Sequence, residues 1–234
     1  MIKVGWCYAG ASWNQLIGKD PEHVETLNKA GSKASLCPAL QDAVENLYQI
    51  PSPFKFHMSC KLTKEGEASV TLHQDSTLMN KTFDQMIQIH HSNEWGTPSR
   101  PLLQILTQIL FVADEDVWME TFMPIFHYRN NPLPIRQAFG RYNICDWQRP
   151  ISCAFEWVDI SKEIIIEEGE PLFYVRFLEP TFSKKITLKK IKFSGELKKH
   201  SDMCKSLVDV VKNTKNYFKI HRLMRPKRYH WEKK

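Results

Sequence analysis

Hydrophobic and polar residues alternate along much of the chain, a pattern typical of β-strands. Two such runs, 54–58 and 68–73, flank the turn signal Lys64-Glu65-Gly66-Glu67 and predict a hairpin. Residues 2–14 are predicted to form a short opening strand and turn, and further predicted strands cover 118–128, 151–157, 164–166, 172–177 and 185–193. The pattern predicts an antiparallel β-sandwich or barrel.

Helix signals are confined to the two ends of the chain. Pro21 and Gly31 predict a helix over 20–31, and Pro38 opens a second one that runs through Tyr48. Near the C-terminus, Ser201 is the predicted cap of an amphipathic helix. Residues 80–100 are predicted to be loop, and 102–112 fits either a strand or a helix.

These elements predict a mainly β protein with flanking helices, of the α+β class. Residues 1–50 would form an N-terminal strand and helices, 51–195 the antiparallel β-domain, and 196–234 a basic C-terminal helix and tail. No repeat or low-complexity linker separates them, so we expect one globular unit.

Charge is distributed unevenly along the chain, which has a net charge of +6. From Lys184 to Lys234 there are 17 Lys and Arg residues against four acidic ones, a net charge of +13. Such asymmetry favours docking to nucleic acid or to an acidic protein surface. A solvated lysine-rich face that keeps the protein in solution explains the same pattern.

The six cysteines form no C-x-x-C pair, and no two have zinc-ligand spacing. We interpret them as reduced and mostly buried thiols. The N-terminus has no signal-peptide pattern, and the longest apolar stretch is too short and too polar to span a bilayer. We therefore expect a protein that is not secreted, located in the cytoplasm of a host cell or in a virion, without a membrane partner.

Several arginines surround the Pro-rich turn Asn131-Pro132-Leu133-Pro134. Arginines on loops at one end of a β-domain can bind phosphate or carboxylate through paired hydrogen bonds, or can hold the loops to backbone carbonyls. The candidates are Arg129, Arg136, Arg141 and Arg149.

The C-terminal tail combines positive charge with aromatic residues. Its basic side chains suit a nucleic-acid backbone, and its aromatic rings suit base stacking or anchoring of the tail to the body. The candidate binding residues are Lys219, Arg222, Arg225, Lys227, Arg228, Tyr229 and Trp231.

One tripeptide, His73-Gln74-Asp75, fits the H-x-D pattern of iron- and 2-oxoglutarate-dependent oxygenases. Such a site needs two histidines and one carboxylate on one face of the metal, so His127 or His200 would be the third ligand. The pattern also fits a polar strand end. The chain has no Gly-rich phosphate loop and no nucleophile elbow, so we predict no cofactor and no resident metal.

Part of the sequence resembles an uncharacterised family of bacteria and tailed phages. That family has a D-W dipeptide, a strand ending in W, a further strand and then G-E-P; here the matching residues are Asp146-Trp147, Trp157, 164–166 and Gly169-Glu170-Pro171. Cys37-Pro38 and Pro53-Phe54-Lys55-Phe56 are similar to its N-terminal part. The family carries no established activity.

A more distant resemblance is to the dUTPase and dCTP deaminase superfamily. Residues 143–148 look like its acidic turn, and 168–175 look like its second turn and strand. The position that matches the catalytic aspartate is Ile144, which cannot take a proton from water. The resemblance therefore implies a dUTPase-like fold without its catalytic set.

The sequence favours a non-catalytic binding or structural protein, phage-encoded, acting as a virion component or an assembly factor. It would dock through its basic C-terminal segment to other subunits of an assembly or to a nucleic-acid backbone, and it could form a homo-oligomer. The alternative is an enzyme, either an oxygenase using His73 and Asp75 or a divergent dUTPase-like enzyme acting on nucleotides.

Overall fold

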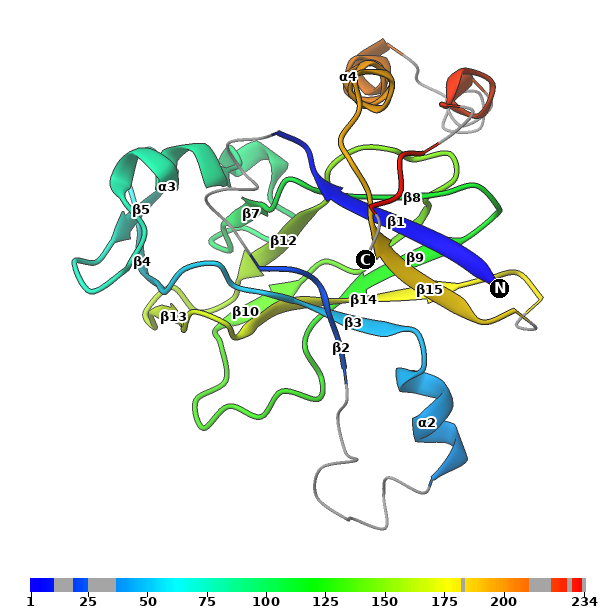
Figure 1. Cartoon of the computed structure of the whole chain (residues 1–234). Helices are drawn as coiled ribbons and strands as arrows, with labels where there is room; N and C mark the ends of the chain where they lie inside the picture. Colours follow the sequence, from blue (N-terminus) through cyan, green and yellow to red (C-terminus); the bar gives the residue numbers. More distant parts are fainter. Residues whose placement is uncertain (11–18, 25–36, 182–183, 211–219, 227–228, 233–234) are drawn as a thin grey trace.

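The computed structural model describes residues 1–10, 19–24, 37–181, 184–210, 220–226 and 229–232, with backbone only for 205–210. Strands are the main regular structure of these residues; they form four sheets, with the helices at the periphery (Figure 1). The predicted mainly β, α+β class is confirmed. The sheets pack on one another and do not close into a barrel.

The largest sheet is antiparallel and has five strands in the order β11-β9-β14-β3-β2. Its central strand β14 is buried along most of its length, because it packs on both neighbours and on the core. The strands are β11 (Gly140–Asn143), β9 (Trp118–Phe122), β14 (Pro171–Leu178), β3 (Leu47–Pro51) and β2 (Glu22–His23).

Two smaller antiparallel sheets extend the β-structure. The first has the order β10-β12-β7-β6 and the second β13-β4-β5. Their strands are β10 (Ile135–Gln137), β12 (Ser152–Trp157), β7 (Leu102–Leu106), β6 (Ile87–Ile89), β13 (Ile164–Ile166), β4 (Phe56–Leu62) and β5 (Ala68–Leu72).

The fourth sheet joins the two ends of the chain. Strand β1 (Ile2–Tyr8) lies between β8 (Ile109–Ala113), which is antiparallel to it, and β15 (Ile186–Lys190), which is parallel. All five residues of β8 are buried. A sheet buried on both faces is rich in consecutive apolar residues rather than alternating ones. This explains why the sequence pattern of 102–112 fitted a helix as well as a strand.

In the part of the chain that the structure describes, the α-helices and one short 3-10 helix lie outside the sheets, and residues 220–224 form a further helical turn. The labelled helices are α2 (Pro38–Val44), α3 (Asn80–Met86), α4 (Gly195–Val210) and η3 (Ser92–Glu94). No helix in the described part of the chain combines the length and apolar character needed to cross a bilayer.

Several predicted elements were wrong in detail. The helix predicted over 20–31 begins instead with strand β2, while 25–31 lie outside the described residues. The predicted loop 80–100 contains α3 and β6, because Phe83, Met86 and Ile87 turn an apolar face to the core.

Two further boundaries differ from the prediction. The second N-terminal helix stops at Val44, because Leu47 and Tyr48 pair with β14. The C-terminal helix begins before Ser201, since the Ser194 hydroxyl accepts a hydrogen bond from the Leu197 backbone amide. Ser201 is instead buried within the helix.

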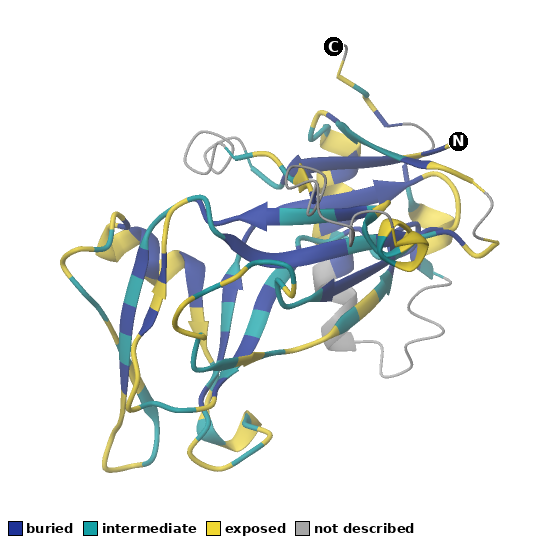
Figure 2. Ribbon diagram, turned by 90° about the horizontal axis from the view of Figure 1, so that it is seen from below, coloured by how far each residue is buried: buried dark blue, intermediate teal, exposed yellow. Residues whose placement is uncertain are grey.

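A single large core lies between the sheets and contains most of the buried aromatic side chains, seen as the dark blue strands of Figure 2. A second, smaller cluster covers the other face of β1 and β8. Its residues are Cys7, Leu110, Val112, Ile191, Leu197 and Tyr229, so α4 and the C-terminal segment seal that face.

Gly5 marks how closely the C-terminal part approaches β1. A Cβ atom added there would lie 3.0 Å from side-chain atoms of both Ile191 and Val112. We expect Gly5→Val to lower the free energy of unfolding by about 1–3 kcal/mol through overpacking. Chemical denaturation measures this change.

Gly195→Ala is the matched control, because a Cβ at Gly195 meets no atom within 4 Å. It should be neutral or slightly stabilising, since alanine is the better helix former. Equal stability of the Gly5→Val variant and the unchanged protein would contradict the close approach.

Candidate functional site

The C-terminal segment is held to the body by a forked ion pair. Arg222 donates from Nε to Asp146 Oδ1 at 2.8 Å and from Nη2 to Asp146 Oδ2 at 2.9 Å. Nη2 also donates to Asp116 Oδ1 at 2.6 Å. The side chain of Asp146 is only 9% exposed, so the guanidinium supplies the partner that a buried carboxylate requires.

Two more tail residues contact the turn that contains Asp146. Arg225 donates to the Cys145 sulfur, and the buried Tyr229 hydroxyl accepts a hydrogen bond from Gln148 Nε2. Burial raises the pKa of Tyr229 well above its usual range. The D-W turn predicted from the sequence is therefore the docking point of the tail.

The last described residues return to the edge of the β15-β1-β8 sheet. Trp231 forms an antiparallel bridge with Ile191, and the Lys192 amide donates to the His230 carbonyl at 2.8 Å. Lys3 Nζ lies 5.8 Å from the centre of the Trp231 ring. The tail thus ends in an isolated bridge to the sheet edge, beside a cationic side chain.

A cavity of about 600 Å³ brings four of the predicted tail residues together. Burial raises the pKa of Asp114 in its wall, although the neighbouring Arg225 works in the opposite direction. The lining residues are Asp114, Arg222, Leu223, Arg225, Pro226, Tyr229 and Trp231. Predicted residues Lys219, Lys227 and Arg228 lie outside the described residues.

A basic surface surrounds this edge. Paired residues of parallel strands face the same side, so the pairing of Gly5 with Lys189 places Lys189 on the same face as Lys3. Lys192 follows on the exposed connection to α4. Among the described residues, Lys3, Lys189 and Lys192 form no ion pair. We call Lys3, Lys189, Lys192 and Trp231 the C-terminal basic surface.

The four loop arginines each have a partner and do not form one cluster. Arg129 pairs with Glu170 at 2.9 Å, and Arg136 pairs with Glu156. Two others stack on tryptophans: Arg141 on Trp118 at 5.1 Å and Arg149 on Trp147 at 5.2 Å. Of the four, only Arg129 lines a cavity described in the structure.

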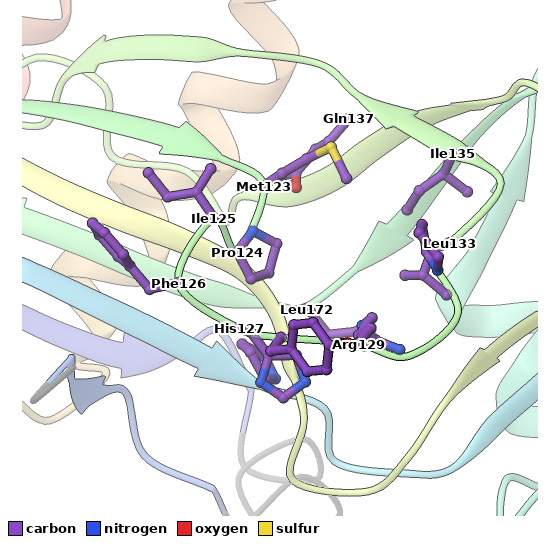
Figure 3. Close-up of a pocket in the computed structure, with 13 residues that line it drawn as sticks. Met123, Pro124, Ile125, Phe126, His127, Arg129, Leu133, Ile135, Gln137 and Leu172 are labelled. Carbon is purple, nitrogen blue, oxygen red and sulfur yellow. The ribbon is translucent and has the colours of Figure 1, made fainter. Parts of the chain in front are cut away.

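That cavity, of about 400 Å³, lies under the loop between β9 and β10 (Figure 3). Its walls are mostly apolar, with Phe126, Leu133 and Leu172 among them, while His127 and Arg129 provide polar groups. Both polar groups contact Glu170. Burial raises the pKa of Glu170, but the Glu167 amide, His127 and Arg129 outweigh it and hold the pKa below its usual range.

The H-x-D residues belong to a different cluster from the one expected. Asp75 accepts a hydrogen bond from His57 Nδ1 at 2.6 Å, and Glu163 lies 2.8 Å from His57 Nε2. His73 stacks on His57 with ring centres 4.1 Å apart. Among the described residues, the groups that could hold a metal at this place contain His57, His73 and Glu163, but neither Asp75 nor His127. The ligand set of the oxygenase alternative is therefore not assembled.

Sequence reasoning missed His57 and Glu163. They are 106 positions apart, and only the pairing of β4 with β13 brings them together. It also missed Cys204, which lies next to two buried histidines. There the i,i+4 spacing of His200 and Cys204 was a usable signal, but the cap predicted at Ser201 left His200 outside the predicted helix.

No family model matches the chain, and neither the curated proteins nor the solved structures include a significant match. The resemblances to a phage family and to the dUTPase superfamily stay predictions.

All six cysteines lie in described residues, and none is in a disulfide.

Replacing Arg222 tests the anchor of the tail. Arg222→Lys keeps the charge but cannot form the two-pronged contact, so we expect a loss of about 1–3 kcal/mol in the free energy of unfolding. Arg136→Lys is the control, because Arg136 is 61% exposed and its pair with Glu156 should contribute less than about 1 kcal/mol. Equal effects of the two substitutions in urea denaturation would refute the anchoring role.

The His57 cluster predicts a pH dependence of stability. The Glu163 carboxylate, and then Asp75, raise the pKa of His57 above its usual value despite burial. A raised folded-state pKa stabilises the fold below the unfolded pKa, and this contribution is lost as pH rises through the folded pKa.

We expect His57→Gln to cost roughly 1 kcal/mol near pH 5.5 and less near pH 8.5. Urea denaturation at the two pH values measures the difference. His91→Gln is the control, because the His91 side chain is 84% exposed. A cost that is the same at both pH values would contradict the assignment.

Proposed function

We propose that the protein is a non-catalytic binding protein that docks on a nucleic-acid backbone through the C-terminal basic surface. One observation carries the proposal: Lys3 and Lys189 lie on the face of the sheet edge that the half-buried Trp231 joins, the exposed Lys192 follows β15, and none of the three lysines forms an ion pair within the described residues. Unpaired ammonium groups beside an aromatic ring suit phosphates with a stacked base.

Within this proposal, the contacts of the tail separate anchoring residues from binding residues. Arg222 and Arg225 contact Asp146 and Cys145 and serve chiefly to hold the segment in place. The lysines therefore supply the charge for the partner. A folded basic surface presents its charges at fixed spacing, so it loses less conformational entropy on binding than a free arm.

The biological setting belongs to the same proposal. The resemblance to tailed-phage proteins supports a role as a virion component or assembly factor, in which the partner is packaged or bound nucleic acid. Ile144, at the position matching the dUTPase catalytic aspartate, is 1% exposed and packs in the main core. This supports a binding role over a dUTPase-like activity.

A charge-reversal experiment tests the proposal. The triple variant Lys3→Glu, Lys189→Glu, Lys192→Glu is compared with the unchanged protein for binding to a fluorescent double-stranded DNA over a salt series. We expect at least about tenfold weaker binding and a salt slope smaller by roughly three phosphate contacts.

The control variant reverses Lys61, Lys64 and Lys81, which are equally charged, exposed and located on other elements. It should bind DNA as the unchanged protein does. If the unchanged protein does not bind DNA at low salt, or if both triple variants lose the same affinity, the nucleic-acid proposal is wrong. The next hypothesis to test would then be binding to an acidic protein partner.

A further inference from the structure

Three potential metal ligands meet in the interior between α4 and the C-terminal helical turn. His200 and Cys204 lie one turn apart on α4, and His221 comes from the turn that follows residue 219. All three are buried, at 3%, 0% and 0% exposure. One ligand atom from each lies within 4.8 Å of the other two.

The distances among these atoms fit a tetrahedral metal. Cys204 Sγ lies 2.8 Å from His221 Nδ1 and 3.8 Å from His200 Nδ1. With Zn–S of about 2.3 Å and Zn–N of about 2.0 Å, tetrahedral ligands are separated by about 3.3–3.5 Å. Both observed distances join sulfur to nitrogen, for which the tetrahedral separation is about 3.5 Å, so changes of about 0.7 Å and about 0.3 Å would admit the ion.

The surroundings orient the ligands as metal sites do. His200 Nε2 lies 3.2 Å from the His221 carbonyl oxygen, which fixes the tautomer that leaves the Nδ1 lone pair facing Cys204. The Gln148 backbone amide also contacts the Cys204 sulfur. Gln148 Oε1 is buried without a partner among the described residues, and an amide oxygen or a water can complete the coordination.

The chemistry of the three donors suits a metal. Imidazole nitrogens and a cysteine sulfur are zinc ligands, and metal binding releases the thiol proton to form the thiolate. No carboxylate belongs to the group.

We propose that His200, Cys204 and His221 bind a zinc ion that clamps the C-terminal turn to α4. Two imidazoles and a thiolate form a donor set that zinc accepts readily. A cavity of about 430 Å³, lined by His200 with Met203 and Met224, gives the ion a route from solvent. The clamp would hold the segment that carries Arg222 and Trp231, and it does not depend on the nature of the docking partner.

Metal analysis of the full chain tests the clamp. Protein purified without chelator should contain close to one zinc per chain, and cobalt loading after zinc removal should give a sulfur-to-cobalt charge-transfer band. Cys204→Ala should lose both signals. A wild-type protein that has no zinc and gives no such band would overturn the proposal.

A matched control separates this site from the second histidine cluster. The double variant His57→Gln, His73→Gln removes the other potential metal group and should retain the zinc and the cobalt band. If it loses them while Cys204→Ala keeps them, the ion belongs to the other cluster and the proposal fails. Circular dichroism of each variant shows whether it is folded. The cobalt titration of the unchanged protein tests the site even if a variant does not fold.

Discussion

The forked contact between Asp146 and Arg222 organises the C-terminal part of this molecule. A carboxylate this deeply buried requires a charge partner, and the guanidinium that supplies it belongs to a segment 76 residues further along the chain. Once Arg222 is fixed, the adjacent His221 is buried beside Cys204, and Tyr229 and Trp231 follow onto the sheet. Within the C-terminal basic surface, Trp231 is the residue that belongs to this anchored segment, while the lysines are placed by the pairing of β1 with β15.

The positive charge of the chain is divided between two physical roles. Arginines of the tail and of the loops contact carboxylates, tryptophans or a sulfur of the body, for which the planar guanidinium is well suited. Lys3 and Lys192 are exposed at the sheet edge and Lys189 is half-buried there, and none of these three lysines forms an ion pair among the described residues. Their charges discourage pairing with another sheet edge and, in our proposal, attract a nucleic-acid partner.

Potential ligand-binding groups are spread over separate parts of the fold. The apolar cavity under the β9–β10 loop, the His57 cluster between β4 and β13, and the His200–Cys204–His221 group have no residue in common. Only the last combines full burial with soft donor atoms, and it alone joins elements with a small shared core. A bound metal stabilises a contact most where hydrophobic burial is limited. We therefore propose the zinc site between α4 and the C-terminal turn.

Local pattern was sufficient for much of the fold and for little of the site. Alternation in β4, β5 and β12 predicted the antiparallel β-class, because the two-residue period is a property of the strand itself. It could not predict β8 as a strand or α3 as a helix, whose burial is set by distant neighbours. Of the predicted binding residues, Arg222, Arg225, Tyr229 and Trp231 line one cavity, whereas the loop arginines contact separate partners; a binding role of either set stays a prediction. Ion pairs such as Arg222–Asp146 and His57–Glu163 join residues far apart in sequence, so only the tertiary fold could decide which charges meet and which remain free for a partner.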